Sequence, residues 1–333
     1  MHRYTSKRAY TLWRGCASGW SDIDSDGRSP TVLSDSIKAV EGDECPPFPM
    51  SNVQTATNFV LRELDIFFAF SWRDWSASII PGLLFSTSAA RASGLPAIIL
   101  LSRYILLIVW ITFYIYSFNL NNQIFGIAAD QIDKPDRPIP SGKVILRGAK
   151  LRWMFTTASF FLSSIFCPSV LPETIVWLLT TVFLNLTTAG NHWVGKNCIA
   201  MSVGAWSLCS ASWKIITPAT AQSTHYVHAF AVWASLATHI QDLRDMKGDA
   251  AMGRKTLPLV FGDVGSRRLL ALIAIPLQGV VLWHAQITHI APVLLGISHV
   301  FVAWRVLQAG RGSKYDHKTY MVGFVQRASV DRR

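Results

Sequence analysis

Long apolar runs alternate with short polar connections along most of this chain. A helix needs about 20 predominantly apolar residues to cross a bilayer, and several of these runs reach that length. The pattern predicts eight transmembrane helices, over 66–90, 95–120, 152–168, 172–190, 197–217, 225–241, 268–284 and 288–308. Arg73 and Asp74 interrupt the first of them, and the third is short. The predicted fold class is therefore an all-α, polytopic integral membrane helical bundle.

The two ends of the chain are polar. Ser, Asp, Gly and Pro dominate between Ser18 and Pro49, without the apolar stretch and cleavage site of a secretory signal. We expect residues 1–62 to form a poorly ordered cytosolic tail, with a transit peptide as the alternative because the opening is basic and poor in acids. The membrane domain is expected over 63–310. Residues 311–333 are expected to form a polar tail or a shortened last helix.

Charge placement orients the predicted helices. Half of the residues are apolar and 15% are charged, against about a quarter in soluble chains, yet the net charge is +11. Lys and Arg gather in the connections after the second, fourth and sixth predicted helices and, Arg91 and Lys214 apart, avoid the opposite side. By the positive-inside rule the basic side and the N-terminus face the cytosol. We expect a multi-pass protein of the endoplasmic reticulum membrane, with the lipid bilayer as a partner and neither nucleic acid nor an obligate protein partner indicated.

Acidic and amide side chains occur where a membrane protein usually avoids them. Three follow the second predicted helix and three follow the sixth: Asn122, Asp130, Asp133, Asp242, Asp245 and Asp249. A carboxylate at membrane depth costs about 2.5–3.5 kcal/mol on insertion scales, so such residues are expected to face a functional cavity. On continuous helices each group would span an arc of only roughly 60–80°. We expect two clusters that each point one way, related as two four-helix pseudo-repeats.

These oxygen ligands suit one particular cofactor. Mg²⁺ typically takes one or two carboxylates and leaves its other positions to water and phosphate oxygens. Basic residues suited to phosphate lie on the same membrane side, namely Lys134, Arg137, Lys196, Arg254 and Lys255. The combination predicts a lipid diphosphate bound through Mg²⁺. The alternative is that the basic residues only fix topology, an interpretation we favour for Arg244, Lys247, Arg267 and Arg268.

The segments around both clusters resemble the signatures of a known family. Residues 122–142, NQIFGIAADQIDKPDRPIPSG, are similar to the first signature of the UbiA superfamily of intramembrane prenyltransferases, and residues 242–258, DLRDMKGDAAMGRKTLP, to the second. The resemblance covers about 65–325. It implies an all-helical membrane enzyme with nine helices, so the polar end of the chain suggests a truncated ninth helix.

The resemblance also implies roles for single residues. It implies metal binding by Asn122, Asp130, Asp242, Asp245 and Asp249, with Asp130, Asp242 and Asp245 as catalytic residues. It implies diphosphate binding by Arg137, Lys196 and Arg73, to which we add the nearby Lys134, Arg254 and Lys255. The first signature departs from the family pattern, because Gln123 and Gly126 stand where acids are usual.

These departures are similar to the fungal branch of the superfamily that contains membrane-bound terpene cyclases. The resemblance therefore implies Mg²⁺-dependent ionisation of an isoprenyl diphosphate followed by cyclisation, as in a sesquiterpene cyclase of secondary metabolism that uses farnesyl diphosphate. The 13 Trp and 18 Phe of the chain would help to stabilise the allylic cation. One alternative is a prenyltransferase that moves the prenyl group to an aromatic or other acceptor. More remote alternatives are a transporter, a lipid-binding protein or an inactive family member.

Overall fold

The computed structural model describes residues 52–328, and all regular elements in that range are helices. Residues 1–51 and 329–333 lie outside the described part, as does most of the expected N-terminal tail. One compact unit begins at Thr55 and contains the helices after the first turn of α2. The helices are α2 Asn52–Ser71, α3 Trp75–Ser93, α4 Ala97–Phe125, α5 Ile127–Asp133, α6 Leu146–Ile165, α7 Leu171–Leu186, α8 Ser202–Ile216, α9 Ala221–Asp242, α10 Met246–Ala251, α11 Leu257–Phe261, α12 Asp263–Leu269, α13 Ile275–His284, α14 Pro292–Val306 and α15 Ser313–Ala328.

The all-α class is confirmed, and the long helices lie close to the predicted ones. Four helical segments of the described part are long and apolar enough to cross a membrane: Ala97–Phe125, Pro168–Leu186, Val194–Ile216 and Asp263–His284. The helix α14 is apolar but shorter. The number of eight membrane crossings therefore stays a prediction.

The start of the membrane domain differs from the prediction. The expected first helix over 66–90 is divided by a 3₁₀ turn, Trp72–Asp74, between α2 and α3. Residues 52–62, expected to be part of a poorly ordered tail, belong to α2 instead. Ile66 and Phe70 of this helix are buried against residues of α4 and α6. The turn lies where the sequence introduces charge, and Arg73 within it forms an ion pair with Asp136.

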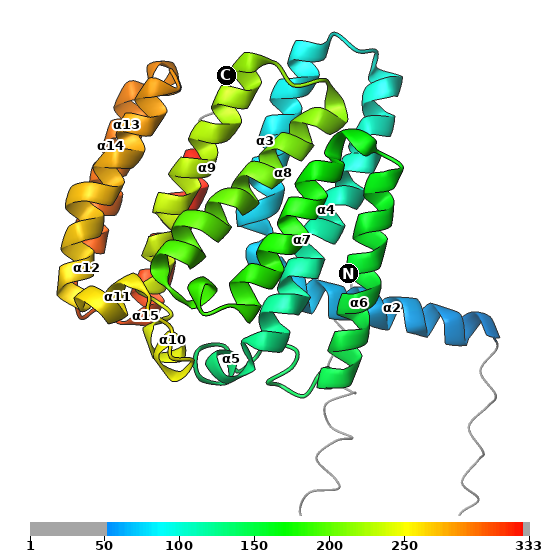
Figure 1. The fold of residues 1–333 in the computed structure, drawn as a ribbon, viewed down its shortest axis with the longest axis horizontal. Coiled ribbons are helices and arrows are strands. Elements are labelled where there is room, and N and C mark those ends of the chain that lie inside the picture. Colours follow the sequence, from blue (N-terminus) through cyan, green and yellow to red (C-terminus); the bar gives the residue numbers. More distant parts are fainter. Residues whose placement is uncertain (1–51, 329–333) are drawn as a thin grey trace, which may run out of the picture. The chain divides into compact units, whose positions relative to one another are not determined.

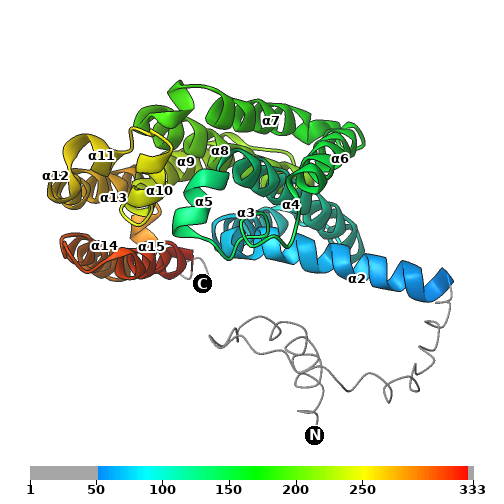
Figure 2. The same ribbon diagram turned by 90° about the horizontal axis from the view of Figure 1, so that it is seen from below.

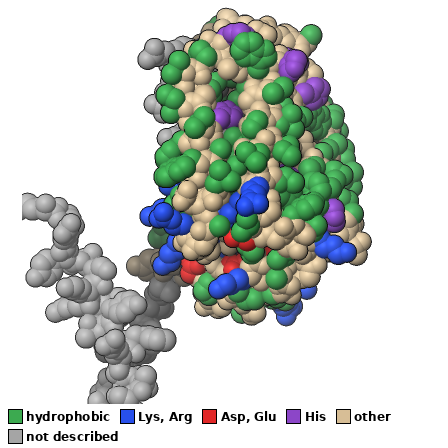
Figure 3. All heavy atoms as spheres, turned by 90° about the vertical axis from the view of Figure 1, so that its left-hand side faces the viewer, with side chains coloured by type: hydrophobic (Ala, Val, Ile, Leu, Met, Phe, Trp, Pro, Cys, Tyr) green, Lys and Arg blue, Asp and Glu red, His purple; other side chains and the backbone are tan. Residues whose placement is uncertain are grey.

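Two short helices cap the same end of the bundle. The helix α5 follows α4 and the helix α10 follows α9, so each half of the chain contributes one cap after one of its long helices. The two caps pack against each other at the lower end of Figure 1, and Figure 2 shows this end directly. On the face seen in Figure 3, Lys and Arg gather in the lower half around recessed carboxylates. The two chain segments with site motifs thus meet at one charged end.

An aromatic stack joins α4, α7 and α8 in the core. The rings of Tyr114 and Trp177 stack with centroids 4.7 Å apart, and Trp110 stacks on Tyr114 at 5.3 Å. The Tyr114 hydroxyl donates to the Gly204 carbonyl at 2.9 Å, and the Trp177 indole N–H donates to the Tyr114 carbonyl at 3.2 Å. A Cβ at Gly204 would lie 2.6 Å from the Trp177 ring, so only glycine lets α8 approach this stack.

Lys214, one of the two basic residues on the side of the bundle that otherwise has no Lys or Arg in its connections, has a local partner. The Nζ of Lys214 lies 2.6 Å from the Oε1 of Glu173, whose side chain is fully buried. Ser210 donates a hydrogen bond to the same oxygen. Lys214 therefore neutralises a buried carboxylate, which explains why it departs from the charge pattern.

The last helix is tied to the bundle by a buried ion pair. The guanidinium of Arg267 in α12 donates to both carboxylate oxygens of Asp316 in α15, at 2.9 and 2.8 Å, and each side chain is only 4% exposed. Arg267 also bonds Asp263 at 2.7 Å and the Val306 carbonyl at 3.1 Å. The interpretation of Arg267 as an interfacial charge is therefore wrong. Most of the segment expected as a polar tail or a shortened last helix is the helix α15, which packs on α14, α9 and α3.

We predict that Asp316→Ala lowers the free energy of unfolding by about 3–5 kcal/mol, because it leaves a buried guanidinium without its bidentate partner. Thermal unfolding in detergent measures the loss. Asp263→Ala is the matched control: this second partner of Arg267 is 33% exposed, and its removal should cost about 1 kcal/mol or less. Equal losses in the two variants would contradict a special role for the Asp316 pair.

Candidate active site

A cavity of ≈ 180 Å³ leads from the two caps into the bundle. Its walls come from α3, α4, α5, α7, the π-helical segment Val194–Met201, α8, α9, α10 and α15. Along α4, Asn122 lies at the charged end, and the helical rise places Phe118 about 6 Å and Tyr114 about 12 Å deeper. On α9, Phe230 lines the wall three turns below the charged end. The cavity is therefore polar at the caps and aromatic inside.

Most of the predicted site residues line this cavity. They are Asn122, Asp130, Lys134, Arg137, Lys196, Asp245, Asp249 and Arg254. Asp242 stands directly behind them and contacts the cavity through Lys196. The side chains of Arg73 and Lys255 lie elsewhere. The structure thus brings together residues that are more than 100 positions apart in the sequence.

Each cluster was expected to lie on one continuous helix, but both helices are interrupted within the cluster. The chain bends at Gly126, so Asn122 belongs to α4 and Asp130 to the separate helix α5. In the same way Asp242 ends α9, whereas Asp249 lies in α10. The expectation of one helical face per cluster is therefore wrong. The bends turn the short caps toward each other across the cavity mouth.

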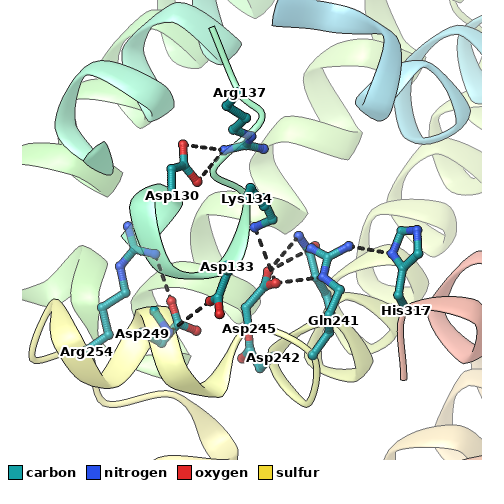
Figure 4. Close-up of polar contacts among 12 residues, drawn as sticks. Asp130, Asp133, Lys134, Arg137, Gln241, Asp242, Asp245, Asp249, Arg254 and His317 are labelled. Carbon is teal, nitrogen blue, oxygen red and sulfur yellow. Dashed lines mark hydrogen bonds and ion pairs between the residues drawn. The ribbon is translucent and has the colours of Figure 1, made fainter. Parts of the chain in front are cut away.

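Ion pairs connect the first motif to the second (Figure 4). Arg137 donates to both oxygens of Asp130, each at 2.8 Å. The Nζ of Lys134 lies 3.3 Å from Asp245, which also receives two hydrogen bonds from Arg244 at 2.6 and 2.7 Å. Burial alone would raise the pKa of Asp245, but the Arg244 hydrogen bonds and the nearby positive charges lower it below the ordinary value.

A second group of ion pairs surrounds Lys196. Its ammonium lies 2.7 Å from Asp242 and 3.5 Å from Asp249. Arg254 pairs with the other oxygen of Asp249 at 2.8 Å. Asn197 donates to Asp242 at 2.7 Å and lies 2.8 Å from the Nδ1 of His239. Both Asp242 and Asp249 are buried, so these cations are what compensates their charge.

A glycine allows the two caps to touch. The backbone N–H of Gly248 in α10 donates to the Asp133 carboxylate at 2.9 Å. A Cβ at this position would overlap that carboxylate and lie 3.0 Å from the Ala129 carbonyl. Burial raises the pKa of Asp133, the hydrogen bond from Gly248 lowers it, and the charge of Asp245 raises it again. The charge of Asp249 acts on Asp133 in the same direction as that of Asp245, so three carboxylates interact at this contact.

The donor chemistry fits Mg²⁺. The candidate ligands are carboxylate and amide oxygens, which this hard cation prefers, and they lie among cations that match phosphate oxygens. Within residues 52–328 no three His, Cys, Asp or Glu side chains form a ready-made metal cage. Mg²⁺ usually needs only one or two carboxylates and completes its shell with water and phosphate oxygens. Such a shell depends on a bound diphosphate.

Two predicted diphosphate ligands stand outside the cavity. Arg73 lines a neighbouring cavity, pairs with Asp136 and lies over the Trp72 ring at 5.3 Å. The side chain of Lys255 is exposed, while its backbone bonds Asn191 and Trp193. Gln123, at a position where the family pattern has an acid, is buried and donates to the Phe70 carbonyl. Its departure from the pattern therefore serves packing.

Sequence reasoning missed several residues of the site. Arg244 was interpreted as an interfacial charge but holds Asp245, and Asn197 orients Asp242. Their positions beside Asp245 and Lys196 in the sequence were the available signal. Tyr320 also lines the cavity, although it comes from the segment expected to be a polar tail or a shortened last helix. Only the docking of α15 brings it there.

Comparison with known proteins agrees with the motifs. The model of the UbiA prenyltransferase family matches residues 78–324. The chain is 56% identical over 262 residues to the diterpene cyclase eriG of Hericium erinaceus, which covers 79% of this chain and 85% of the relative. It is 54% identical over 262 residues to the polyprenyl transferase eriF of the same fungus, with 79% and 91% covered.

The fold has a counterpart among solved structures. A UbiA homolog from Archaeoglobus fulgidus bound to GPP and Mg²⁺ aligns with a TM-score of 0.59 at 13% identity, covering 78% of this chain and 99% of that one. The family match spans both cap motifs and nearly all of the helical bundle. The chain therefore belongs to the UbiA prenyltransferase family, as a UbiA-type membrane enzyme.

Proposed function

We propose that this enzyme is a terpene cyclase, which ionises an isoprenyl diphosphate with Mg²⁺ and lets the allylic cation close onto a double bond of the same chain. The observation that carries this proposal is the position of the acid–base cluster at the mouth of a cavity with aromatic walls. Below the caps, the described lining residues from α4, α7, α8 and α9 include no Asp, Glu, Lys, Arg or His, and Lys196 lies near the mouth in the π-helical segment Val194–Met201. A cation formed there meets the rest of its own chain.

The charged end is suited to the leaving group. We assign the metal to Asn122, Asp130, Asp242, Asp245 and Asp249. When bound, Mg²⁺ supplies positive charge that stabilises the departing diphosphate. Lys196, Arg137 and Arg254 place fixed positive charge in the same region, where negative charge develops as the allylic C–O bond breaks. Lys134 lies at the junction of the two motifs and adds a fourth cation.

The aromatic end is suited to the cation. Tyr114, Phe118, Trp177 and Phe230 line the cavity. Aromatic faces attract a cation by about 0.5–2 kcal/mol each, and more where water is excluded. Hydrogen bonds and stacking hold Tyr114 and Trp177 in place, so these two rings are preorganised before substrate arrives.

The relatives bear on the length of the substrate. Because eriG is named a diterpene cyclase, we propose a 20-carbon isoprenyl diphosphate rather than the 15-carbon farnesyl diphosphate expected from the sequence. The nearly equal identity to the polyprenyl transferase eriF supports transfer to an acceptor as the second candidate. The basic end supports a cytosol-facing site, and we propose the endoplasmic reticulum membrane as its location.

Membranes that contain the protein should convert geranylgeranyl diphosphate and Mg²⁺ into a cyclic hydrocarbon without any acceptor, and EDTA should stop the reaction. Gas chromatography with mass spectrometry identifies the product. Preferred turnover of farnesyl diphosphate would restore the 15-carbon prediction. Product that forms only after an aromatic or other acceptor is added would overturn the cyclase and favour the transferase.

Asp242→Ala should abolish turnover while the protein still inserts into membranes. Retained turnover would remove Asp242 from the site.

Two lysines from the predicted diphosphate set provide a matched pair. Lys196→Met should lower kcat/KM by about 100- to 1000-fold, because it removes a half-buried positive charge from the place where the leaving group would bind. Lys255→Met should change kcat/KM by about fivefold at most, because its ammonium is exposed outside the cavity. Steady-state release of diphosphate from detergent-solubilised enzyme measures both. An equal loss in the two variants would mean that the cavity is not where the diphosphate binds.

A further inference from the structure

A second cavity, of ≈ 550 Å³, lies beside the active-site cavity and is lined mainly by charged residues. We call it the vestibule. It lies between the 3₁₀ turn before α3, the segment after α5, the α9–α10 connection and α15. Its charged lining includes Arg73, Arg244, Lys314 and Lys318. Such a surface holds water, whereas the interior of the active-site cavity is apolar and aromatic.

The wall between the two cavities contains one aromatic ring. Residues that line both cavities include Asp74, Asp133, Lys134, Gln241 and Asp245, all charged or carrying an amide, and Tyr320. Among the described residues shared by the two cavities, Tyr320 is the only aromatic one. It is therefore the residue best able to separate water in the vestibule from a reacting hydrocarbon chain.

Charged neighbours hold this ring in place. The guanidinium of Arg244 lies over the Tyr320 ring, 5.7 Å from its centroid. Arg244 is itself fixed by two hydrogen bonds to Asp245, at 2.6 and 2.7 Å, and lies 2.8 Å from the Nδ1 of His317 one turn away on α15. The ring is thus linked through one arginine to a carboxylate of the charged end.

The position of α15 determines where the ring stands. Figure 2 shows α15 between α14 and α3, and the buried Arg267–Asp316 pair ties it to α12 one turn before Tyr320. The pair contacts neither the active-site cavity nor the vestibule. Its effect on the reaction therefore acts through the placement of α15.

We propose that Tyr320 is the water-excluding residue of the active site and that α15, docked by the Arg267–Asp316 pair, holds it there. This inference rests on the proposed ionisation of an isoprenyl diphosphate. When the C–O bond breaks, its electron pair leaves with the diphosphate. The cation then either loses a proton to the released diphosphate and becomes a hydrocarbon, or forms a C–O bond with water, which passes one proton to the diphosphate and gives an alcohol. Tyr320 favours the first outcome because it keeps vestibule water from the cation.

The share of alcohol in the product tests the proposal. Tyr320→Ala should raise this share by about threefold or more, because the wall then opens to the vestibule. Tyr320→Phe keeps the ring and should keep the native ratio. Met321→Ala is the matched control, because this neighbouring side chain lines only the vestibule, and it should also keep the native ratio.

Reactions run in ¹⁸O-labelled water identify the source of the alcohol oxygen. Water that captures the cation puts the label on carbon, whereas a contaminating phosphatase cleaves the P–O bond and leaves the alcohol unlabelled. Asp316→Asn is the second variant: it weakens the hold on α15 without touching the wall and should raise labelled alcohol in the same direction. If Tyr320→Ala is inactive, the Asp316→Asn ratio decides.

The outcomes separate this inference from the proposed function. Native enzyme that consumes no isoprenyl diphosphate overturns the proposed function and this inference with it. Native enzyme that makes hydrocarbon, while Tyr320→Ala and Asp316→Asn keep the native hydrocarbon-to-alcohol ratio, overturns the role of Tyr320 alone. A rise of equal size in Met321→Ala would also overturn it, because the share of alcohol would then not depend on the aromatic ring between the two cavities.

Discussion

Buried carboxylates at the end of an apolar bundle must be compensated, and the architecture of this enzyme follows from that requirement. Asp130, Asp242, Asp245 and Asp249 are all less than 10% exposed. Each has a guanidinium or ammonium partner, and the partner of Asp245 from the first motif, Lys134, lies on the other half of the chain. Unpaired, such charges would cost several kcal/mol each. Pairing across the two halves therefore fixes how the halves meet.

The same requirement explains the local irregularities of the chain. The bend at Gly126 and the turn after Asp242 let α5 and α10 leave the directions of their long helices and face each other. The missing side chain of Gly248 lets the two caps approach within hydrogen-bonding distance. The cations that pair with these carboxylates have a second consequence. They place positive charge where a diphosphate would bind, and the diphosphate oxygens would fill the positions that a hard metal ion leaves open to them.

The aromatic interior and the last helix complement the charged mouth. Tyr114 and Trp177 are held by hydrogen bonds and by the close approach of α8 at Gly204, so both rings are fixed in the wall of the cavity. The helix α15 closes the opposite side, and a buried ion pair to Arg267 holds it there. Charge thus stabilises the walls at two places, while the chemistry proposed for the interior depends on the exclusion of charge and water.

Local patterns were enough to predict the long helices and most of the charged residues that line the cavity, because apolar runs and misplaced acids are visible without any tertiary contact. The resemblance to the family motifs pointed to Asn122, Asp130 and Asp245, which all line the cavity, and the charge pattern indicated which end of the bundle holds them. Tertiary structure decided the rest. The exposed Lys255 and the cavity-facing Lys196 are both basic residues near motifs, and only packing separates them.

Tertiary structure also decided the fate of the C-terminal segment. Its polar composition predicted a tail or a shortened last helix and left open which, since a pattern of residues records hydropathy but not partners. Asp316 is polar in the sequence and becomes a buried anchor only because Arg267 meets it from α12, and that contact carries Tyr320 into the wall of the cavity. The sequence by itself therefore determined which chemical groups the enzyme has and on which side of the membrane domain they lie. Three-dimensional packing decided which of those groups share one cavity, because ion pairs and close helix contacts join residues that are far apart along the chain.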